Sequence, residues 1–497
     1  MKNTTMKDTC ATPCADAAFP SDPTTATVLR AAFEAWSAGA SMRRCRERLK
    51  RYTYGRQWDD MTIDSQGNPC SEYELAVRSG HRPLTNNLMR RLVKTVVGRF
   101  REAYPQADGV LQPLYRANAL RELDSRAFEE FVISGCAVQR IVRERRMRGD
   151  GVWVDNVDPS RFFVSGMRDP RGWDAELVGM LHDMTLSEVI MRFAGGDRRR
   201  AAALRAMLLS EASPGVTVTP LGGDEGMETQ FYHAPQGRCR LVEVWTLDSE
   251  ERVVCHDRST GRVYAVPVSD AQAVEAESRR RLGEGMPPID TRWEMGARWM
   301  CRWITPSGRL LARFPSPWPH GEHPFVLKLY PLTDGEIHPF IEDVVDQQRY
   351  VNRLITLIDN IMGSSAKGVL LFPDDQLSPL TRWEDVAQRW ASTDGVIPYR
   401  AKGDQKPTQI YSHNNDVGAY NLLSLEMRLF DEVSGVGGAL QGKEISGTMS
   451  ASLYEQQVRN SSVALTDLFE SFACFRSDRD AKLIAVAPDG HRANSQA

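Results

Sequence analysis

The chain has 497 residues, of which 41% are hydrophobic and 26% are charged, and its formal net charge is −3 with a pI near 6.4. This length exceeds what one hydrophobic core usually organises, so we expect two to four structural regions. The slightly acidic balance excludes a strongly basic nucleic-acid clamp, because tight backbone binding requires a surplus of Lys and Arg.

The nine cysteines are dispersed along the chain, which argues against a disulfide framework or a paired zinc site and favours reduced thiols. No stretch of eighteen apolar residues is uninterrupted, and the first residues lack the apolar centre of a signal peptide. We therefore expect a protein that does not associate with a membrane. We expect it to be assembled in the cytoplasm of a cell.

The first half of the chain alternates between helical and strand-like patterns. Leu88, Leu92, Val96 and Phe100 recur every four residues and predict one helix. Thr185 and Glu188 have the spacing of a capping box and predict the start of another. A Gly/Pro-rich loop is expected through 213–228. Further helices are predicted near 28–36, 118–133, 198–212 and 271–282, and strands near 137–146, 151–164, 240–268 and 297–314.

Two long helices are predicted after Pro339, over 339–363 and 418–436, and each carries two apolar stripes. A surface that broad suits a helix that is packed on two sides. The stripes are Val344, Val351, Ile355, Ile358 and Met362 with Val345, Leu354 and Ile361 on the first helix, and Tyr420, Leu423, Met427 and Phe430 with Leu422, Leu425, Leu429 and Val433 on the second. Residues 341–436 contain fourteen acidic and nine basic residues, a net charge of −5, so the acidic share is concentrated here.

The stretch GGALQGKE at 437–444 comes within one residue of the phosphate-binding pattern G-x-x-x-x-G-K-[ST]. A helix rather than a strand is predicted before it, and Glu444 stands where Ser or Thr would bind magnesium, so its carboxylate would repel phosphate oxygens. A nucleotide hydrolase therefore stays an alternative that the pattern disfavours. The glycines indicate instead a mobile loop between two helices.

Other chemical candidates are weak. The acids Glu342, Asp343, Asp346 and Asp359 could be metal ligands or catalytic carboxylates, but a solvated helix face explains them as well. His323 and its neighbours fit turns before proline better than a metal site. We predict no catalytic constellation, no metal and no cofactor, and hence no enzyme.

The order of these elements resembles the portal proteins of tailed bacteriophages. The resemblance is carried by YGRQWDD, RPLTNN and RLVKTVVGRF, by NVDPSRFFVSGMRDPRGWDAELVGMLHDMTLSEVIMRF, by HPFVLKLYPL and DVVDQQRYVNRLITLID, and by ALQG, SGT and the final helix. It covers roughly residues 50 to 475, and the ordered set of segments, rather than any single motif, makes it specific.

The resemblance implies an α+β fold of portal type, with a mixed α/β wing and two long stem helices that bracket a small α/β clip. Its segments would be a flexible N-terminus (1–26), the wing (27–338), the first stem helix (339–363), the clip (364–414), the second stem helix (415–434), a Gly-rich tunnel loop (435–450) and a helix toward a short crown with a C-terminal tail (451–497). Because few residues follow Phe475, no large crown is expected.

The resemblance also implies a function. Portal proteins form rings, usually of twelve subunits, at one capsid vertex of the virion, and double-stranded DNA passes through the centre during packaging, retention and ejection. The expected partners are other copies of the chain, DNA, the terminase motor, capsid and scaffold proteins, and neck or adaptor proteins. A head-completion adaptor remains an alternative, although such proteins are usually shorter.

Specific residues are expected to serve this function. The tunnel loop would present Gln441, Lys443, Glu444, Ser446 and Thr448 to DNA. Acids of the stem, Glu342, Asp346, Asp359 and Glu426, are candidates to line the channel, where a net negative wall repels phosphates and limits friction. Contacts between neighbouring subunits are expected from Val344, Val351, Ile355, Leu425 and Leu429, because each helix of a ring must bury a face against its neighbours.

Overall fold

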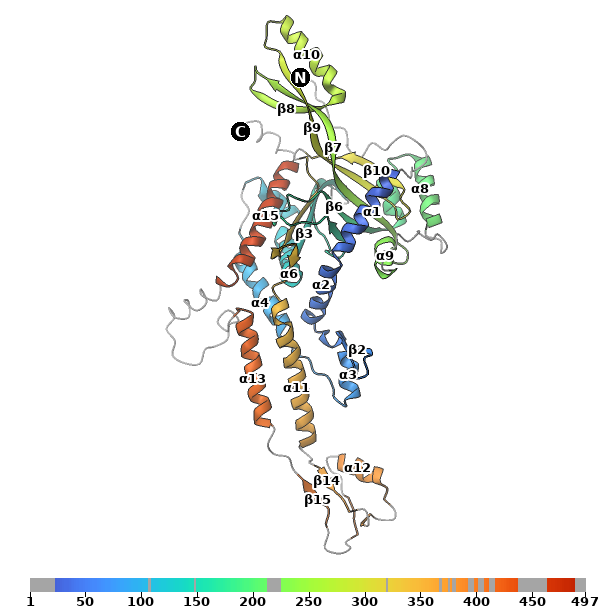
Figure 1. Ribbon diagram of the computed structural model, residues 1–497, viewed down its shortest axis with the longest axis vertical. Helices are drawn as coiled ribbons and strands as arrows, with labels where there is room; N and C mark the ends of the chain where they lie inside the picture. Colours follow the sequence, from blue (N-terminus) through green and yellow to red (C-terminus); the bar gives the residue numbers. More distant parts are fainter. Residues whose placement is uncertain are drawn as a thin grey trace, which may run out of the picture. The chain divides into compact units, whose positions relative to one another are not determined.

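The computed structural model describes residues 23–105, 109–146, 149–211, 225–318, 321–365, 369–373, 376–377, 381–391, 397–400, 406–410, 416–436 and 463–487. They form two compact units (Figure 1). The described residues of unit 1 fall within 23–45, 101–338 and 468–487, and those of unit 2 within 46–100 and 339–467. The predicted α+β mixture of helices and strands is confirmed, and the paired strands are antiparallel.

Unit 1 is built around two antiparallel sheets. The larger has the strand order β10–β9–β7–β6–β5 with β8 paired to β7, and the smaller has the order β11–β3–β4. Trp245, Trp303 and Phe325 are buried in its main core. The strands are β3 (Cys136–Arg146), β4 (Gly149–Asn156), β5 (Phe162–Val164), β6 (Leu177–Met184), β7 (Cys239–Asp257), β8 (Arg262–Pro267), β9 (Ile289–Ile304), β10 (Leu310–Pro315), β11 (Phe325–Leu329) and the short pair β12 (Leu332–Thr333) and β13 (Glu336–Ile337).

Helices cover these sheets at positions that the sequence largely predicted. The capping box of α7 is confirmed, since Thr185 accepts from the backbone N–H of Glu188 while the Glu188 side chain accepts from that of Thr185. The helices are α1 (Pro23–Ala38), the first part of α2 (Ala40–Thr53), α5 (Leu111–Ala117), α6 (Leu120–Ser134), α7 (Leu186–Phe193), α8 (Arg198–Glu211), α9 (Glu225–Tyr232), η2 (Val268–Asp270), α10 (Ala271–Gly283) and α15 (Thr466–Val486).

Helix α9 corrects the loop expected through 213–228, because it begins at Glu225. Its last two residues, Phe231 and Tyr232, are buried, and both rings lie within 5.6 Å of the Phe33 ring of α1. Packing of these two aromatic rings stabilises this short helix. The Gly- and Pro-rich sequence that precedes it had predicted a loop.

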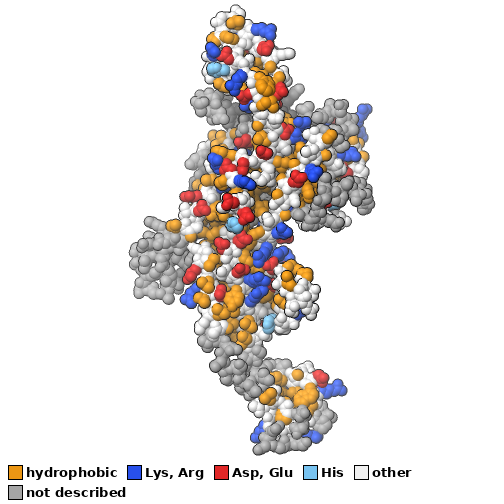
Figure 2. Space-filling view, in the orientation of Figure 1, with side chains coloured by type: hydrophobic (Ala, Val, Ile, Leu, Met, Phe, Trp, Pro, Cys, Tyr) orange, Lys and Arg blue, Asp and Glu red, His pale blue; other side chains and the backbone are white. Residues whose placement is uncertain are grey.

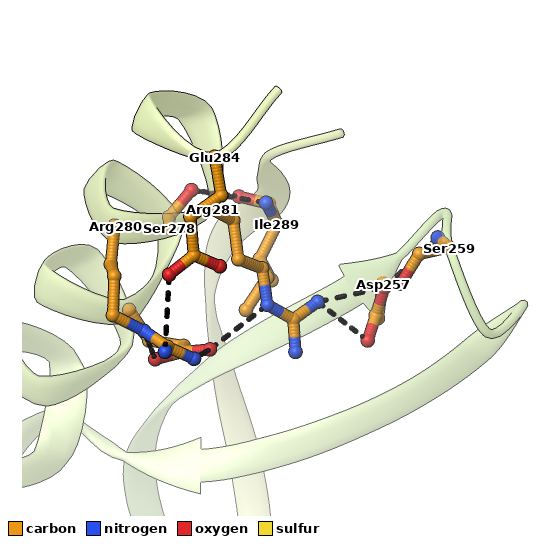
Figure 3. Close-up of polar contacts among 8 residues, drawn as sticks. Asp257, Ser259, Ser278, Arg280, Arg281, Glu284 and Ile289 are labelled. Atoms are coloured by element: carbon orange, nitrogen blue, oxygen red, sulfur yellow. Dashed lines mark hydrogen bonds and ion pairs between the residues drawn. The ribbon is translucent and has the colours of Figure 1, made fainter. Parts of the chain in front are cut away.

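Strands β7 and β9 continue beyond the core as a long ribbon that carries β8 and α10 at its end (Figure 1). Polar contacts hold α10 on this ribbon, as Figure 3 shows. Arg281 donates to Asp257 of β7 at 2.8 Å and to Glu277 at 3.0 Å, and the hydroxyl of Ser278 accepts from the backbone N–H of Ile289 at 3.0 Å. The attachment is mainly ionic because no residue of α10 is buried.

Helix α15 is anchored on α6 by a buried charge network. Asp124 of α6 is fully buried and contacts both Arg479 and Arg476 of α15. The same carboxylate accepts from the Tyr104 hydroxyl at 2.8 Å and from Gln139 at 3.1 Å. Burial and the adjacent Asp124 charge raise the pKa of Tyr104, so its hydroxyl stays a donor.

Unit 2 consists mainly of helices. Its elements are the last part of α2, η1 (Gln57–Asp59), β1 (Met61–Ile63), β2 (Pro69–Ser71), α3 (Glu72–Arg78), α4 (Leu88–Glu102), η3 (Glu342–Val344), α11 (Val345–Ser365), β14 (Val369–Leu371), α12 (Trp383–Ala391), β15 (Thr408–Ile410) and α13 (Asp416–Val433). Helix α11 continues two residues past the end predicted at Gly363. Residues 46–100, expected within the wing segment 27–338, group here with 339–467.

We predict that Arg479→Ala destabilises unit 1 by about 3–5 kcal/mol, because it removes a fully buried partner of a fully buried carboxylate. Chemical denaturation followed by circular dichroism measures this change. Arg279→Ala is the control, since Arg279 makes a solvent-exposed ion pair with Glu275 within α10 and should leave the midpoint unchanged. Equal midpoints for the two variants would contradict the anchoring role.

Candidate functional site

Helix α11 lies in the middle of unit 2, with α13 on one side and α3 on the other (Figure 1). On the α13 side, the Tyr420 hydroxyl lies 3.0 Å from the Met362 sulfur, and Phe430 of α13 is buried. Met362 belongs to the apolar stripe that contains Val351 and Ile358, so this stripe faces α13.

The opposite face of α11 is held to α3 by ion pairs. Arg349 and Arg353, one helical turn apart, both contact the carboxylate of Glu72 at the start of α3. Glu72 is only 5% exposed, so these two guanidinium groups are the partners that offset the burial of its side chain.

A column of buried polar residues on a third face of α11 binds the backbone that leads into α4. Gln348, Asn352 and Thr356 recur every four residues and are buried. Gln348 accepts from the backbone N–H groups of Leu88 at 2.8 Å and Met89 at 3.0 Å. Asn352 accepts from that of Asn86 at 2.9 Å, and Thr356 accepts from that of Leu84 at 3.0 Å. Gln348 also donates to the carbonyl of Asn86 at 2.6 Å. This column caps the N-terminus of α4 and explains why residues 46–100 fold with α11.

The residues expected at subunit contacts divide into two groups. Val344 and Val351 have exposed fractions of 0%, so both are buried within the chain and have no surface to offer a neighbour. At these two positions the stripe packs inside unit 2, whereas Met362 of the same stripe is 52% exposed. Ile355 and Leu429 are partly buried, whereas Leu425 is 43% exposed.

The acids expected in the channel do not share one face. Asp346 and Asp359 are exposed, and Glu342 and Glu426 are partly buried. Asp359 follows Asp346 by thirteen residues. At about 100° per residue, the two side chains are separated by roughly 220° around the axis of an α-helix. One surface of α11 can therefore present only one of them.

The predicted tunnel-loop residues, Gln441, Lys443, Glu444, Ser446 and Thr448, lie outside the described residues, as does the phosphate-loop-like stretch 437–444. The turn expected at His323 fits the structure, because its Nδ1 accepts from the backbone N–H of Phe325 at 3.3 Å. Among the described residues, no three His, Cys, Asp or Glu side chains gather where they could hold a metal.

A buried polar cluster in unit 1 has the shifted pKa values that often mark catalytic sites. Burial alone would raise the pKa of Glu243, but the Arg140 charge and a 2.8 Å hydrogen bond with His182 lower it. Burial lowers the pKa of His182, which favours the neutral imidazole. Glu243 is 1% exposed, and Arg140 and the Trp245 N–H also contact it. A substrate cannot reach the carboxylate, so the cluster is structural.

None of the helices in the described part of the chain is both long and apolar enough to span a bilayer. The unit 2 framework is a set of paired helices with a column of buried polar residues, and its described residues contain no cluster of catalytic or metal-binding side chains.

Comparison with protein families decides the identity of the chain, because a profile described as phage P22-like portal protein matches residues 29–489. The chain belongs to this portal protein family. Comparison with curated proteins found no match.

Membership of the portal family, whose members are structural proteins, assigns the chain to the portal vertex of a phage virion. The prediction that this chain is a bacteriophage portal protein is confirmed. The polar column of this portal protein was missed by sequence reasoning. Its signal is the recurrence of Gln348, Asn352 and Thr356 at four-residue spacing on an otherwise apolar helix, which marks side chains that must find buried partners.

We predict that Asn352→Leu destabilises unit 2 by about 1–3 kcal/mol, since the partly buried N–H of Asn86 and the buried amide of Gln57 then lose their partner. Asn360→Leu is the matched control, because Asn360 is exposed on the same helix. Denaturation midpoints of both variants measure the difference. A midpoint for Asn352→Leu at the control's value would show that the column does not hold the 84–89 backbone.

Proposed function

We propose that this portal protein assembles into a ring, of twelve copies as is usual for portals, through which double-stranded DNA enters and leaves the capsid. The observation that carries this proposal is the family match over residues 29–489. On this proposal the ring also binds the terminase motor, capsid and scaffold proteins during assembly in the host cytoplasm, and neck proteins afterwards.

The charge distribution supports a conduit rather than a clamp. Residues 341–436 have a net charge of −5, with fourteen acidic and nine basic residues. An acidic wall keeps phosphates away from the protein, because each Lys–phosphate contact would release counterions and hold the moving polymer. Glu342, Asp346, Asp359 and Glu426 remain candidates for this wall, with Asp346 and Asp359 on different sides of α11.

The segments retain their proposed roles in this scheme. Helices α11 and α13 correspond to the two stem helices, and residues 364–414 between them to the clip that would meet the motor and the neck. The clip candidate contains the antiparallel pair of β14 and β15 and helix α12. Residues 435–450 would form the tunnel loop. In this loop Lys443 would bind DNA phosphates weakly, because the neighbouring carboxylate of Glu444 repels them.

A nucleotide hydrolase using 437–444 has no comparable support, because the family match is to a structural protein. Turnover of ATP that disappears in Lys443→Ala would revive that alternative, since a phosphate loop depends on its lysine.

We predict that the chain without residues 438–447 still forms rings but packages or retains less DNA in infected cells. The reason is that, on this proposal, the subunit contacts lie outside the loop. Averaged electron micrographs of the purified protein measure ring formation, and nuclease-protected DNA per capsid measures packaging. The control is the full-length chain.

Two results would contradict the proposal in different ways. Full-length protein that stays monomeric at every salt and protein concentration would refute the ring. Loss of rings in the loop deletion alone would refute the separation of assembly from DNA handling.

A further inference from the structure

Unit 2 exposes apolar side chains on both of its outer sides. On the α3 side, Met61 and Ile63 of β1 are 62% and 69% exposed, and Tyr73 and Val77 of α3 are 53% and 49% exposed. We call these four residues the hairpin patch. Single exposed apolar residues are common, but four within one small module indicate a surface that is covered in the working protein.

Local geometry explains why the hairpin patch points outward. Met61 and Ile63 alternate with Thr62, which is paired with the buried Cys70, so they lie on the other face of the β1–β2 hairpin. Tyr73 and Val77 are one helical turn apart on α3, next to Glu72, whose side chain is buried against Arg349 of α11. The inner faces of both elements are thus already occupied.

The other outer side is formed by α13. Its stripe of Leu422, Leu425, Leu429 and Val433 lies away from the buried Phe430, and Leu425 and Val433 are 43% and 46% exposed. We call these four residues the α13 stripe. Because Arg349 and Met362 lie on opposite faces of α11, the hairpin patch and the α13 stripe lie on opposite sides of unit 2 (Figure 1).

The two sides also differ in charge. Residues 46–82, which contain the hairpin patch, have seven basic and six acidic residues, and Arg349 and Arg353 of α11 add to this side. Figure 2 shows Lys and Arg side chains gathered over the region of α2 and the first turns of α11. The described residues of α13 carry four acids, including Glu426 and Glu432, against one base. The hairpin side thus has a small positive net charge, and α13 has a negative one.

We propose that the hairpin patch of one copy binds the α13 stripe of the next copy, so that unit 2 forms a head-to-tail contact. A head-to-tail ring requires two different, mutually complementary surfaces on each subunit, which is what the opposed apolar patches and opposite charges supply. Opposite charges favour this pairing and disfavour contacts between like patches. The inference rests on the proposed ring and identifies the residues that close it.

Four side chains on each copy are a small part of a stable interface, which buries about 1,600 Å² in total. The contact must therefore extend over the charged residues around the patches, with the apolar side chains at its centre.

The test uses two variants that each destroy one patch. Ile63→Asp/Val77→Asp removes the hairpin patch and leaves the α13 stripe intact, whereas Leu425→Asp/Val433→Asp does the reverse. All four positions are exposed, so both variants should fold, and circular dichroism with thermal melting checks this. Met191→Asp is the control, because Met191 is an exposed apolar residue of unit 1 outside both patches.

Native mass spectrometry, with chemical cross-linking to trap weak contacts, should find rings for the wild type and for Met191→Asp. Each patch variant alone should lose its rings. An equimolar mixture of the two should form dimers and nothing larger, because one intact hairpin patch meets one intact α13 stripe and both outer ends of that dimer are broken.

The outcomes separate this contact from the proposed function. Rings from either patch variant alone, or a mixture of folded variants that forms no dimer, would overturn the contact while leaving a wild-type ring in place. A wild-type chain that forms no ring would overturn the proposed function and the contact with it.

Discussion

The burial of α11 on three faces is the constraint on which the rest of unit 2 depends. One face packs against α13, another binds Glu72 through Arg349 and Arg353, and the polar column fixes the backbone of residues 84–89. A buried amide or carboxylate without a partner is costly, so the two polar contacts fix the position of α11 against residues 72 and 84–89. The part of α11 that stays exposed lies outside these three faces and includes Tyr350 and Leu357.

This arrangement changes where subunit contacts should be sought. A helix with two apolar stripes suits a position between two neighbouring subunits, and α11 has such stripes. Val344 and Val351 of one stripe and Val345 and Leu354 of the other are buried inside the chain, whereas Met362 is 52% exposed. Exposed apolar side chains remain on the outer elements β1, α3 and α13, and α11 also exposes Tyr350 and Leu357. We therefore propose that unit 2 meets neighbouring copies through its outer sides.

Much of this framework could be predicted from the sequence, because periodic apolar residues determine local structure directly. The helices α4, α11 and α13, the capping box at Thr185 and the portal family were all recognised from residue patterns. Patterns fail where the decisive partner is distant in the chain. The burial of Val351 depends on packing within the folded unit, the attachment of residues 84–89 depends on Asn352, and α9 depends on Phe33, none of which a local period reveals.

The most direct test of this account is a cryo-electron microscopy map of the purified assembly, detailed enough to place side chains. The account predicts a closed ring in which Ile63 of each copy is buried against Leu425 of the adjacent copy, while Val344 and Val351 stay enclosed by their own chain. A ring in which Ile63 and Leu425 both face solvent, or in which Val351 contacts a neighbouring copy, would contradict it.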